Sequence, residues 1–188
     1  MSIKIPFFSI LIPSYNRPDE LSRCMSSIIA GSFEDYEIII SDDNSPRKSE
    51  IEAVVQSFGS GGKIRFYQQA SNLKEPDNKN FLVNKARGQF NIILGDDDTL
   101  AKEALSYLYN YIDVEPRSDI YGFGYRVVDE HGGHLSVNRS SRSVHLEGHV
   151  SRLKLLEAGL LPMAIFHPAT FCCRAGVEKS LPYSTQVG

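Results

Sequence analysis

Short apolar runs and amphipathic stretches alternate along the first part of the chain. Continuous apolar runs of four to eight residues are typical of buried strands. Such runs end at polar or proline residues, which supports the same interpretation. They predict strands at residues 7–12, 36–41 and 90–94, and the alternation of Ile64 and Phe66 with polar residues predicts a further strand at 63–68.

Helices are predicted between these strands, where apolar residues recur three and four positions apart. The first helix follows Pro18 and ends before Gly31. The second begins near Ser49 and Glu52, whose spacing matches a capping box in which each side chain caps the backbone N–H of the other. Two further helices are predicted at residues 78–87 and 101–112.

The alternation of strand and helix predicts an α/β fold, with a mostly parallel sheet covered by helices on both faces. After Pro116 the pattern changes and the alternation is lost. In this second part the sequence predicts a strand at residues 119–129, a hairpin turn at 130–134, a helix at 150–158 and a strand at 164–173.

Composition narrows the class of protein. The 188 residues are 41% hydrophobic and 23% charged, which is ordinary for a globular domain. A formal net charge of −3 makes a nucleic-acid-binding protein a poor fit. Three cysteines, two of them adjacent, do not suit a disulfide framework and favour a reducing, cytoplasmic setting. No apolar run approaches the ~20 residues of a transmembrane helix.

The candidate functional residues are expected in the loops after the strands, because ligands of parallel α/β sheets bind at the carboxyl ends of the strands. Two of these loops are acidic: Asp42-Asp43 and Asp96-Asp97-Asp98. Two carboxylates ~4 Å apart repel by about 4 kcal/mol at an effective dielectric constant near 20. Such clusters need either full solvation or a cation, and Mg²⁺ or Mn²⁺ prefers these oxygen ligands.

Each acidic loop also has a simpler interpretation. The second cluster can cap the helix that follows, since acidic residues are common at helix N-termini. In the loop Asp42-Asp43-Asn44-Ser45, one acid can serve only the turn. Alternatively, a buried carboxylate there can accept hydrogen bonds from a nucleobase N–H.

Several segments in a fixed order resemble the family 2 glycosyltransferases of the GT-A fold. They are residues 8–17, 36–45 and 92–98, with Lys79, Asn80, Ala86 and Gly88 between the last two. The resemblance implies a Rossmann-like, mostly parallel central sheet with helices on both faces and a small β-hairpin extension. It also implies a nucleotide-sugar-binding half at residues 1–115 and the start of an acceptor-side half at 116–188, truncated at its C-terminus.

The resemblance implies roles for individual residues. The acidic cluster corresponds to the family's Asp-x-Asp motif, although Gly95 stands where an Asp often opens it. Asp96 would contact the ribose, and the metal ligands would be Asp97 and Asp98. Asp43 would bind the edge of a uracil-type base. The other nucleotide-binding residues would be Pro13, Ser14, Tyr15, Arg17, Asp42 and Lys79.

The resemblance implies transfer, with inversion, of a sugar from a nucleotide-diphosphate donor of the UDP type to a hydroxyl acceptor. The metal would be Mn²⁺ or Mg²⁺, and the acceptor a saccharide or lipid-linked saccharide in bacterial surface polysaccharide synthesis. The protein would be cytoplasmic or peripheral to the inner face of the membrane. Glu178 is the only carboxylate after Glu157, so the general base is expected beyond Gly188.

Three alternatives to a glycosyltransferase remain, and two of them make a requirement of the loop after the first strand. A sugar-1-phosphate nucleotidyltransferase would need a glycine-rich basic loop there, and a receiver-type signalling domain an acidic pair. Residues 13–17, Pro-Ser-Tyr-Asn-Arg, supply neither. A non-catalytic module that binds a sugar nucleotide stays open, because the general base is not found in the chain.

Overall fold

The four predicted strands form the parallel centre of a six-stranded sheet. The computed structural model describes residues 4–59, 61–114, 116–122, 124–129, 133–138, 171–180 and 183. The sheet has the order β3-β2-β1-β4-β8-β5. The first four strands in this order run parallel to one another. They are β1 (Phe8–Ser14), β2 (Tyr36–Asp42), β3 (Ile64–Gln68) and β4 (Phe90–Ile93).

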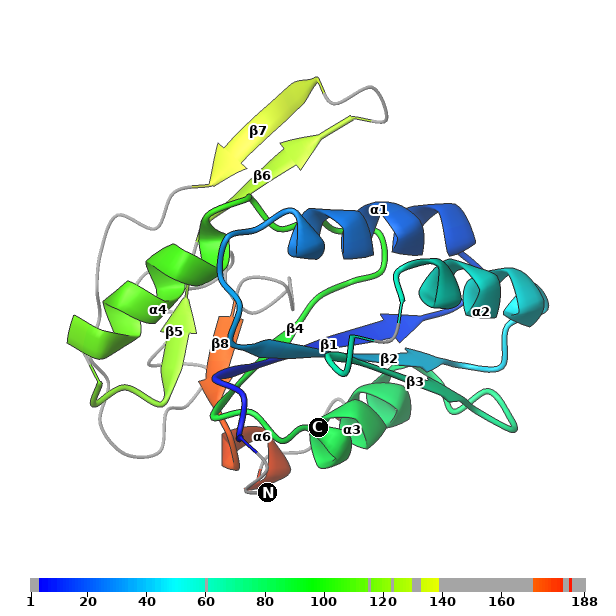
Figure 1. Ribbon diagram of the computed structural model, residues 1–188, viewed down its shortest axis with the longest axis horizontal. Coiled ribbons are helices and arrows are strands. Elements are labelled where there is room, and N and C mark those ends of the chain that lie inside the picture. Colours follow the sequence, from blue (N-terminus) through cyan, green and yellow to red (C-terminus); the bar gives the residue numbers. More distant parts are fainter. Residues whose placement is uncertain are drawn as a thin grey trace, which may run out of the picture.

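Helices cover both faces of this sheet (Figure 1). α1 (Pro18–Ile29), α2 (Lys48–Ser57) and α4 (Ala104–Val114) contribute to one core cluster with the residues of the central strands that point to their side. α3 (Glu75–Lys85) packs on the opposite face, over a smaller cluster that contains Leu11 and Ile39. The predicted fold class, a mostly parallel α/β sheet with two covered faces, is confirmed.

Three of the predicted helices begin at residues other than those expected. The capping box of Ser49 and Glu52 does not form, because the N-cap position falls two residues earlier, at Arg47, which makes no side-chain cap. Instead, Arg47 forms an ion pair with Glu50 at 2.6 Å. α3 begins at Glu75 rather than residue 78, with proline in its first turn, and α4 begins at Ala104 after a turn at residues 101–104.

The predicted strand at 119–129 is wrong as a single element. It divides into β5 (Ile120–Gly122) and β6 (Tyr125–Val128), which belong to different sheets. β5 has a core residue, since Tyr121 is buried, whereas no residue of β6 is buried. The chain therefore passes from the main sheet to the two-stranded sheet between β5 and β6.

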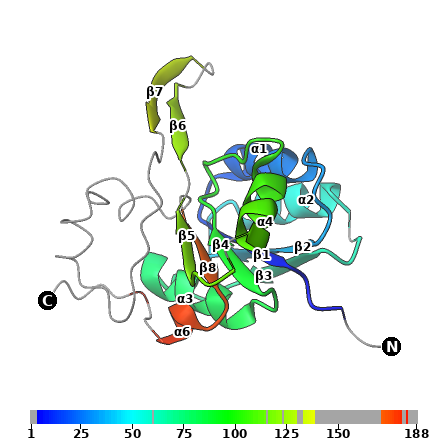
Figure 2. The same cartoon turned by 90° about the vertical axis from the view of Figure 1, so that its left-hand side faces the viewer.

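The predicted hairpin is confirmed. β6 pairs antiparallel with β7 (His134–Asn138), and the Gly133 N–H donates to Asp129 Oδ1 at 2.7 Å. The hairpin stands apart from the main sheet, as Figure 2 shows. The predicted helix at 150–158 lies outside the described residues, as does the first part of the strand predicted at 164–173. The end of that strand is β8 (Phe171–Arg174), which lies antiparallel between β4 and β5; α6 (Val177–Ser180) follows it.

A buried polar network ties three strands to the connection between α3 and β4. Glu37 is 7% exposed and accepts hydrogen bonds from Ser9 Oγ at 2.6 Å and from the Arg87 N–H at 2.7 Å. Its other oxygen pairs with Arg65 at 2.8 Å. The Gly88 N–H donates to Ser9 Oγ, and a Cβ at Gly88 would come within 2.6 Å of the Ser9 backbone nitrogen. Only glycine allows this close approach.

Candidate functional site

The loops after β1, β2 and β4 meet at the carboxyl edge of the sheet, as the parallel topology requires. The Asp43 N–H donates to the Ser14 carbonyl oxygen at 2.9 Å, which joins the first two loops. The Tyr15 N–H donates to Asp96 Oδ2 at 3.2 Å, which joins the first loop to the third. The sequence therefore predicted correctly which loops are neighbours.

The third loop is a tight turn, residues 95–98, which we call the acidic turn. Its Asp98 N–H donates to the Gly95 carbonyl oxygen at 3.1 Å. Asp96 is buried, with 5% of its surface exposed, whereas the side chain of Asp97 is 56% exposed. Consecutive acids in this turn therefore occupy different environments, which fits different tasks.

Gly95 makes room for two of these carboxylates. A Cβ atom on Gly95 would lie 2.9 Å from Asp97 Oδ1 and 2.9 Å from Asp98 Oδ2. The carboxylates of Asp97 and Asp98 thus converge over the space that a larger residue would fill. The absence of a side chain at Gly95, which departs from the family motif, has a direct structural consequence here.

Arg17 pairs with the acidic turn from the loop after β1. Its Nη1 atom lies 2.6 Å from Asp97 Oδ2 and 3.4 Å from Asp96 Oδ1. The guanidinium is 52% exposed, so it lies at the solvent side of the turn. Arg17 therefore bridges the buried carboxylate and the exposed one.

The electrostatics of the turn are dominated by burial and by the clustering of charge. Burial raises the pKa of Asp96, and the charge of Asp97 acts in the same direction, while Ser14, the Tyr15 N–H and Arg17 oppose the shift. The two carboxylates raise the pKa of Arg17. A buried acid beside two further acids is a position where a cation or a hydrogen-bond donor of a ligand is favoured.

Cys24 supports the acidic turn from α1. It is fully buried, and its thiol donates a long hydrogen bond of 3.5 Å to the Gly95 carbonyl oxygen. Burial, followed by the charges of the turn, raises the pKa of this thiol far above its ordinary value. The apolar stripe predicted that Cys24 would be buried, but no pattern in the sequence indicated that it would lie beneath the turn.

Asp42 is used within its own loop. Its carboxylate is fully buried and accepts hydrogen bonds from the hydroxyl and, at 3.3 Å, from the N–H of Ser45. The Ser45 hydroxyl in turn accepts a hydrogen bond from the Asn16 N–H at 2.7 Å. Asn16 and Asn44 have φ values of 60° and 59°, in the left-handed region that asparagine tolerates. Asp42 thus shapes both loops from beneath, which matches the simpler interpretation of this acid.

Asp43 holds the segment between β3 and α3. Its carboxylate accepts hydrogen bonds from the Leu73 N–H at 2.6 Å and the Lys74 N–H at 3.0 Å. Lys74 has a φ of 72°, which turns the chain toward this carboxylate. A carboxylate has about four acceptor positions, so Asp43 retains capacity for a further donor such as a base N–H.

Lys79 lies in the first half of α3, within the segment predicted to be helical. Its side chain is 9% exposed, forms an ion pair with Glu75, and lies with its Nζ atom 5.7 Å from the centre of the Tyr183 ring. Pro13 lies near the end of β1 and is half-buried, whereas Tyr15 is exposed in the loop that follows this strand. Thus, among the predicted residues, contacts join Ser14, Tyr15, Arg17, Asp43, Asp96 and Asp97, while Lys79 has separate partners.

The acidic turn fits a divalent cation held by two protein ligands. Among the residues that the structure describes, no group of three or more His, Cys, Asp or Glu side chains is placed to hold a metal ion. However, Mg²⁺ commonly takes only one or two carboxylates and completes its shell with water and substrate phosphates. The converging oxygens of Asp97 and Asp98 suit that arrangement.

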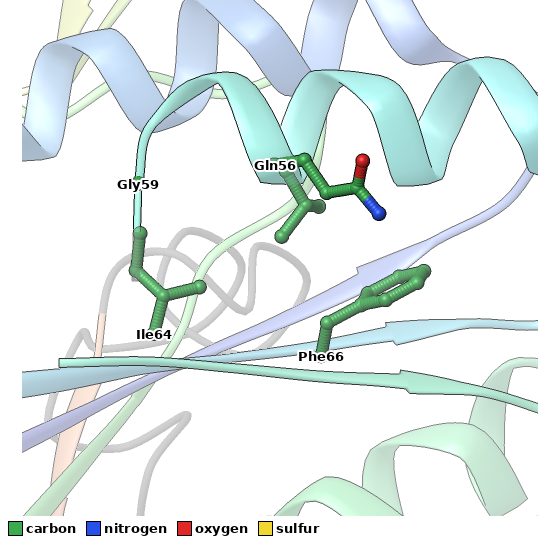
Figure 3. Close-up of a pocket in the computed structure, with 5 residues that line it drawn as sticks. Gln56, Gly59, Ile64 and Phe66 are labelled. Atoms are coloured by element: carbon green, nitrogen blue, oxygen red, sulfur yellow. The ribbon is translucent and has the colours of Figure 1, made fainter. Parts of the chain in front are cut away.

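A separate apolar pocket of about 410 Å³ lies between α2 and the edge strand β3 (Figure 3). Gln56, Gly59, Ile64 and Phe66 line it with Val55. Ile64 and Phe66 both belong to β3. No residue of the acidic turn or of the first two loops lines it, and it is not part of the candidate site.

The strand order, the parallel direction of the central strands and the acidic turn at the carboxyl edge together define a Rossmann-like α/β domain, a class of fold in which ligands bind at that edge. The chain belongs to glycosyl transferase family 2: the model of this family matches residues 9–175. Its fold is the GT-A fold.

Particular relatives and solved structures agree with this membership. The chain is 31% identical over 156 residues to a GalNAc(5)-diNAcBac-PP-undecaprenol beta-1,3-glucosyltransferase of Campylobacter jejuni, a match that covers 82% of the chain and 48% of the relative. Staphylococcus aureus TarS (residues 1–349), solved with UDP-GlcNAc, superposes with a TM-score of 0.68 at 18% identity over 93% of this chain and 47% of that one. The mannosyltransferase PcManGT of Pyrobaculum calidifontis, solved with GDP-Man and Mn²⁺, gives 0.68 at 14% identity over 98% and 49%.

The chain thus spans about half the length of these proteins. In the part of the chain that the structure describes, no helix is long and apolar enough to cross a membrane.

Proposed function

We propose that this chain is the donor-binding part of an inverting glycosyltransferase that uses a nucleotide-diphosphate sugar. The observation that carries the proposal is the joining of the loop after β1 to the acidic turn, through the Tyr15 N–H and Arg17 on Asp96 and Asp97. This junction forms a polar floor at the carboxyl edge, where nucleotides bind in such sheets. Membership of glycosyl transferase family 2 supports the same conclusion.

In this proposal, different residues contact different parts of the donor. Asp43 accepts a hydrogen bond from the base, of the uracil type, since TarS was solved with UDP-GlcNAc. Asp96 accepts hydrogen bonds from ribose hydroxyls, for which a buried carboxylate with a fixed orientation is suited. Arg17 and Lys79 face the diphosphate. Pro13, Ser14 and Tyr15 line the pocket, and Asp42 holds its two loops in place.

Asp97 and Asp98 are the proposed ligands of Mn²⁺ or Mg²⁺, and PcManGT was solved with Mn²⁺. A metal ion bound there would neutralise charge that develops on the nucleoside diphosphate as it leaves. The two carboxylates orient toward one space because Gly95 has no side chain. Asp96 stays outside this pair, so that ribose and metal have separate ligands.

The acceptor hydroxyl needs a general base, and we place this base beyond Gly188. The relative of Campylobacter jejuni is about twice as long as this chain and is named for an undecaprenol-linked acceptor. We therefore propose a saccharide or lipid-linked saccharide as the acceptor, and a role in bacterial surface polysaccharide synthesis. Such an acceptor would place the protein in the cytoplasm, at or near the inner face of the membrane.

The test is thermal unfolding with UDP, GDP, CMP and TDP, each with and without Mn²⁺. A ligand at a hundredfold excess over its Kd stabilises the folded chain by about 2.7 kcal/mol. We expect a metal-dependent rise in Tm with UDP that is lost in Asp97→Asn. Asp113→Asn, an exposed acid on α4, is the matched control and keeps the rise. No rise with any nucleotide would contradict the proposal.

A further inference from the structure

We infer that Arg17 is the internal counter-ion of the acidic turn and that it competes with the divalent cation for Asp97. This inference rests on the proposed function, because it concerns the same metal and donor. Its consequence is an order of events: the metal binds at full strength only when the diphosphate of the donor has drawn Arg17 away from the turn.

The competition follows from the position of one carboxylate. Asp97 Oδ2 lies 2.6 Å from Arg17 Nη1, while Asp97 Oδ1 points toward the space above Gly95 that it shares with Asp98 Oδ2. The carboxylate that would bind the metal is therefore already bound on one side by a cation. A divalent ion at Asp97 would place two positive charges beside the guanidinium, and like charges at this range repel.

Arg17 is able to leave the turn without disturbing the buried acid. Its side chain is 52% exposed, and its contact with Asp96 is the longer one, at 3.4 Å. Asp96 keeps the hydrogen bond from the Tyr15 N–H when Arg17 moves. The shape of the turn also keeps its support from Cys24, whose thiol donates to the Gly95 carbonyl oxygen.

The diphosphate is a better partner for Arg17 than the exposed carboxylate. A guanidinium binds phosphate oxygens through two parallel hydrogen bonds, a geometry that matches its planar fork. In the ligand-free chain Arg17 reaches Asp97 through a single nitrogen, Nη1. Donor binding would therefore exchange partners: Arg17 would move from carboxylate to phosphate, which would leave Asp97 available to hold a metal ion that neutralises charge on the diphosphate.

The size of the effect is set by the exposure of the pair. Exposed ion pairs contribute 0.2–1 kcal/mol, which corresponds to a factor of about 1.4–5 in an equilibrium constant at 1.36 kcal/mol per tenfold. Removal of Arg17 should therefore tighten nucleotide-free Mn²⁺ binding by a factor of about 1.4 to 5. It should also reduce the factor by which UDP improves Mn²⁺ binding, because linkage makes that coupling reciprocal.

The test measures Mn²⁺ binding directly, by the electron paramagnetic resonance signal of free Mn²⁺, with and without UDP. Arg17→Gln is compared with Arg23→Gln, which removes the same charge from an exposed position on α1 where Arg23 pairs with Glu20. Arg17→Lys is a second variant that keeps the charge but not the planar fork. We expect tighter nucleotide-free binding in Arg17→Gln, no change in Arg23→Gln beyond a general charge effect, and binding near wild type in Arg17→Lys.

The outcomes separate this inference from the proposed function. If the wild-type chain binds Mn²⁺ and UDP together but Arg17→Gln is no tighter for Mn²⁺ alone than Arg23→Gln, the competition is refuted and the proposed function stands. If wild type and variants bind no Mn²⁺ under any condition, both are refuted. Tighter metal binding in Arg17→Gln together with weaker UDP binding supports both.

Discussion

The side-chain amide of Asn80 makes a pair of hydrogen bonds with the backbone of Tyr183, 103 residues further along the chain. The amide NH₂ donates to the Tyr183 carbonyl oxygen, and the amide oxygen accepts from the Tyr183 N–H, each at 2.9 Å. The Tyr183 ring packs against the core cluster on the α3 face and lies near Lys79. Asn80 thus fixes a distant segment beside the helix that carries a proposed donor residue.

Asn80→Ala should lower the free energy of unfolding by about 1–2 kcal/mol, because two hydrogen bonds are lost at a half-buried position. The measurement is the midpoint of urea unfolding. Asn84→Ala, at an exposed position one turn further along α3, is the control and should cost less than 0.5 kcal/mol or so. Equal losses in the two variants would show that the contact with Tyr183 contributes nothing to stability.

Gly95→Ala should remove metal-dependent nucleotide binding while the ligand-free chain still folds. The new Cβ would meet the ends of two side chains, Asp97 and Asp98, rather than backbone. These carboxylates can rotate away at little cost to the fold, but they then no longer converge. The measurement is the rise in Tm with UDP and Mn²⁺, relative to the Tm without ligand. Gly61→Ala, where a Cβ would meet nothing within 4 Å, is the control; a rise retained in Gly95→Ala would contradict the two-carboxylate site.

Glu37→Gln should destabilise the fold by about 3 kcal/mol, the scale expected when one partner of a buried ion pair is removed. The variant leaves Arg65 without its charged partner, and it places a donor NH₂ either against Arg65 or against the Ser9 hydroxyl and the Arg87 N–H, which donate to the same oxygen of Glu37. Chemical denaturation measures the loss. Glu34→Gln removes a carboxylate that is 79% exposed and paired with Lys63, and should cost under ~1 kcal/mol. Similar losses at both positions would mean that the buried network carries no special stability.

Stability should fall as the pH rises above about 9, partly through Cys24. Burial raises the pKa of this thiol in the folded chain, so it stays protonated there, while in the unfolded chain it ionises near its ordinary value of 9.0. Ionisation then favours the unfolded state, by about 1.4 kcal/mol at pH 10 for one such group. Tyr36 and Tyr121, whose pKa values burial also raises, act in the same direction at higher pH.

The contribution of Cys24 is isolated by Cys24→Ala. The variant should lose less free energy of unfolding between pH 8 and pH 10 than wild type, by about the same 1.4 kcal/mol, whatever its stability at neutral pH. Parallel pH profiles of the two proteins would show that Cys24 is not protected from ionisation in the fold.

The pattern of apolar and polar residues was sufficient to predict the parallel strands at the centre of the fold. The strands from Phe8, Tyr36 and Phe90 are buried on both faces, so they read as continuous apolar runs, and the helices between them repeat at helical spacing. Parallel connections then bring the loops at Ser14, Asp42 and the acidic turn to one edge. The candidate site could be located because this rule depends on chain direction alone.

Only the tertiary structure decided what each polar side chain binds. Asp42 and Asp43 are neighbours in sequence, yet one serves Ser45 and the other the backbone at Leu73 and Lys74. Glu37 stands inside an apolar run, and its burial is explained only by Arg65 on the adjacent strand. Local patterns report burial and direction, whereas partners depend on contacts between segments tens of residues apart, which no local pattern contains. The pairing of Arg17 with Asp97, on which the proposed exchange with a metal ion rests, is such a contact between distant segments.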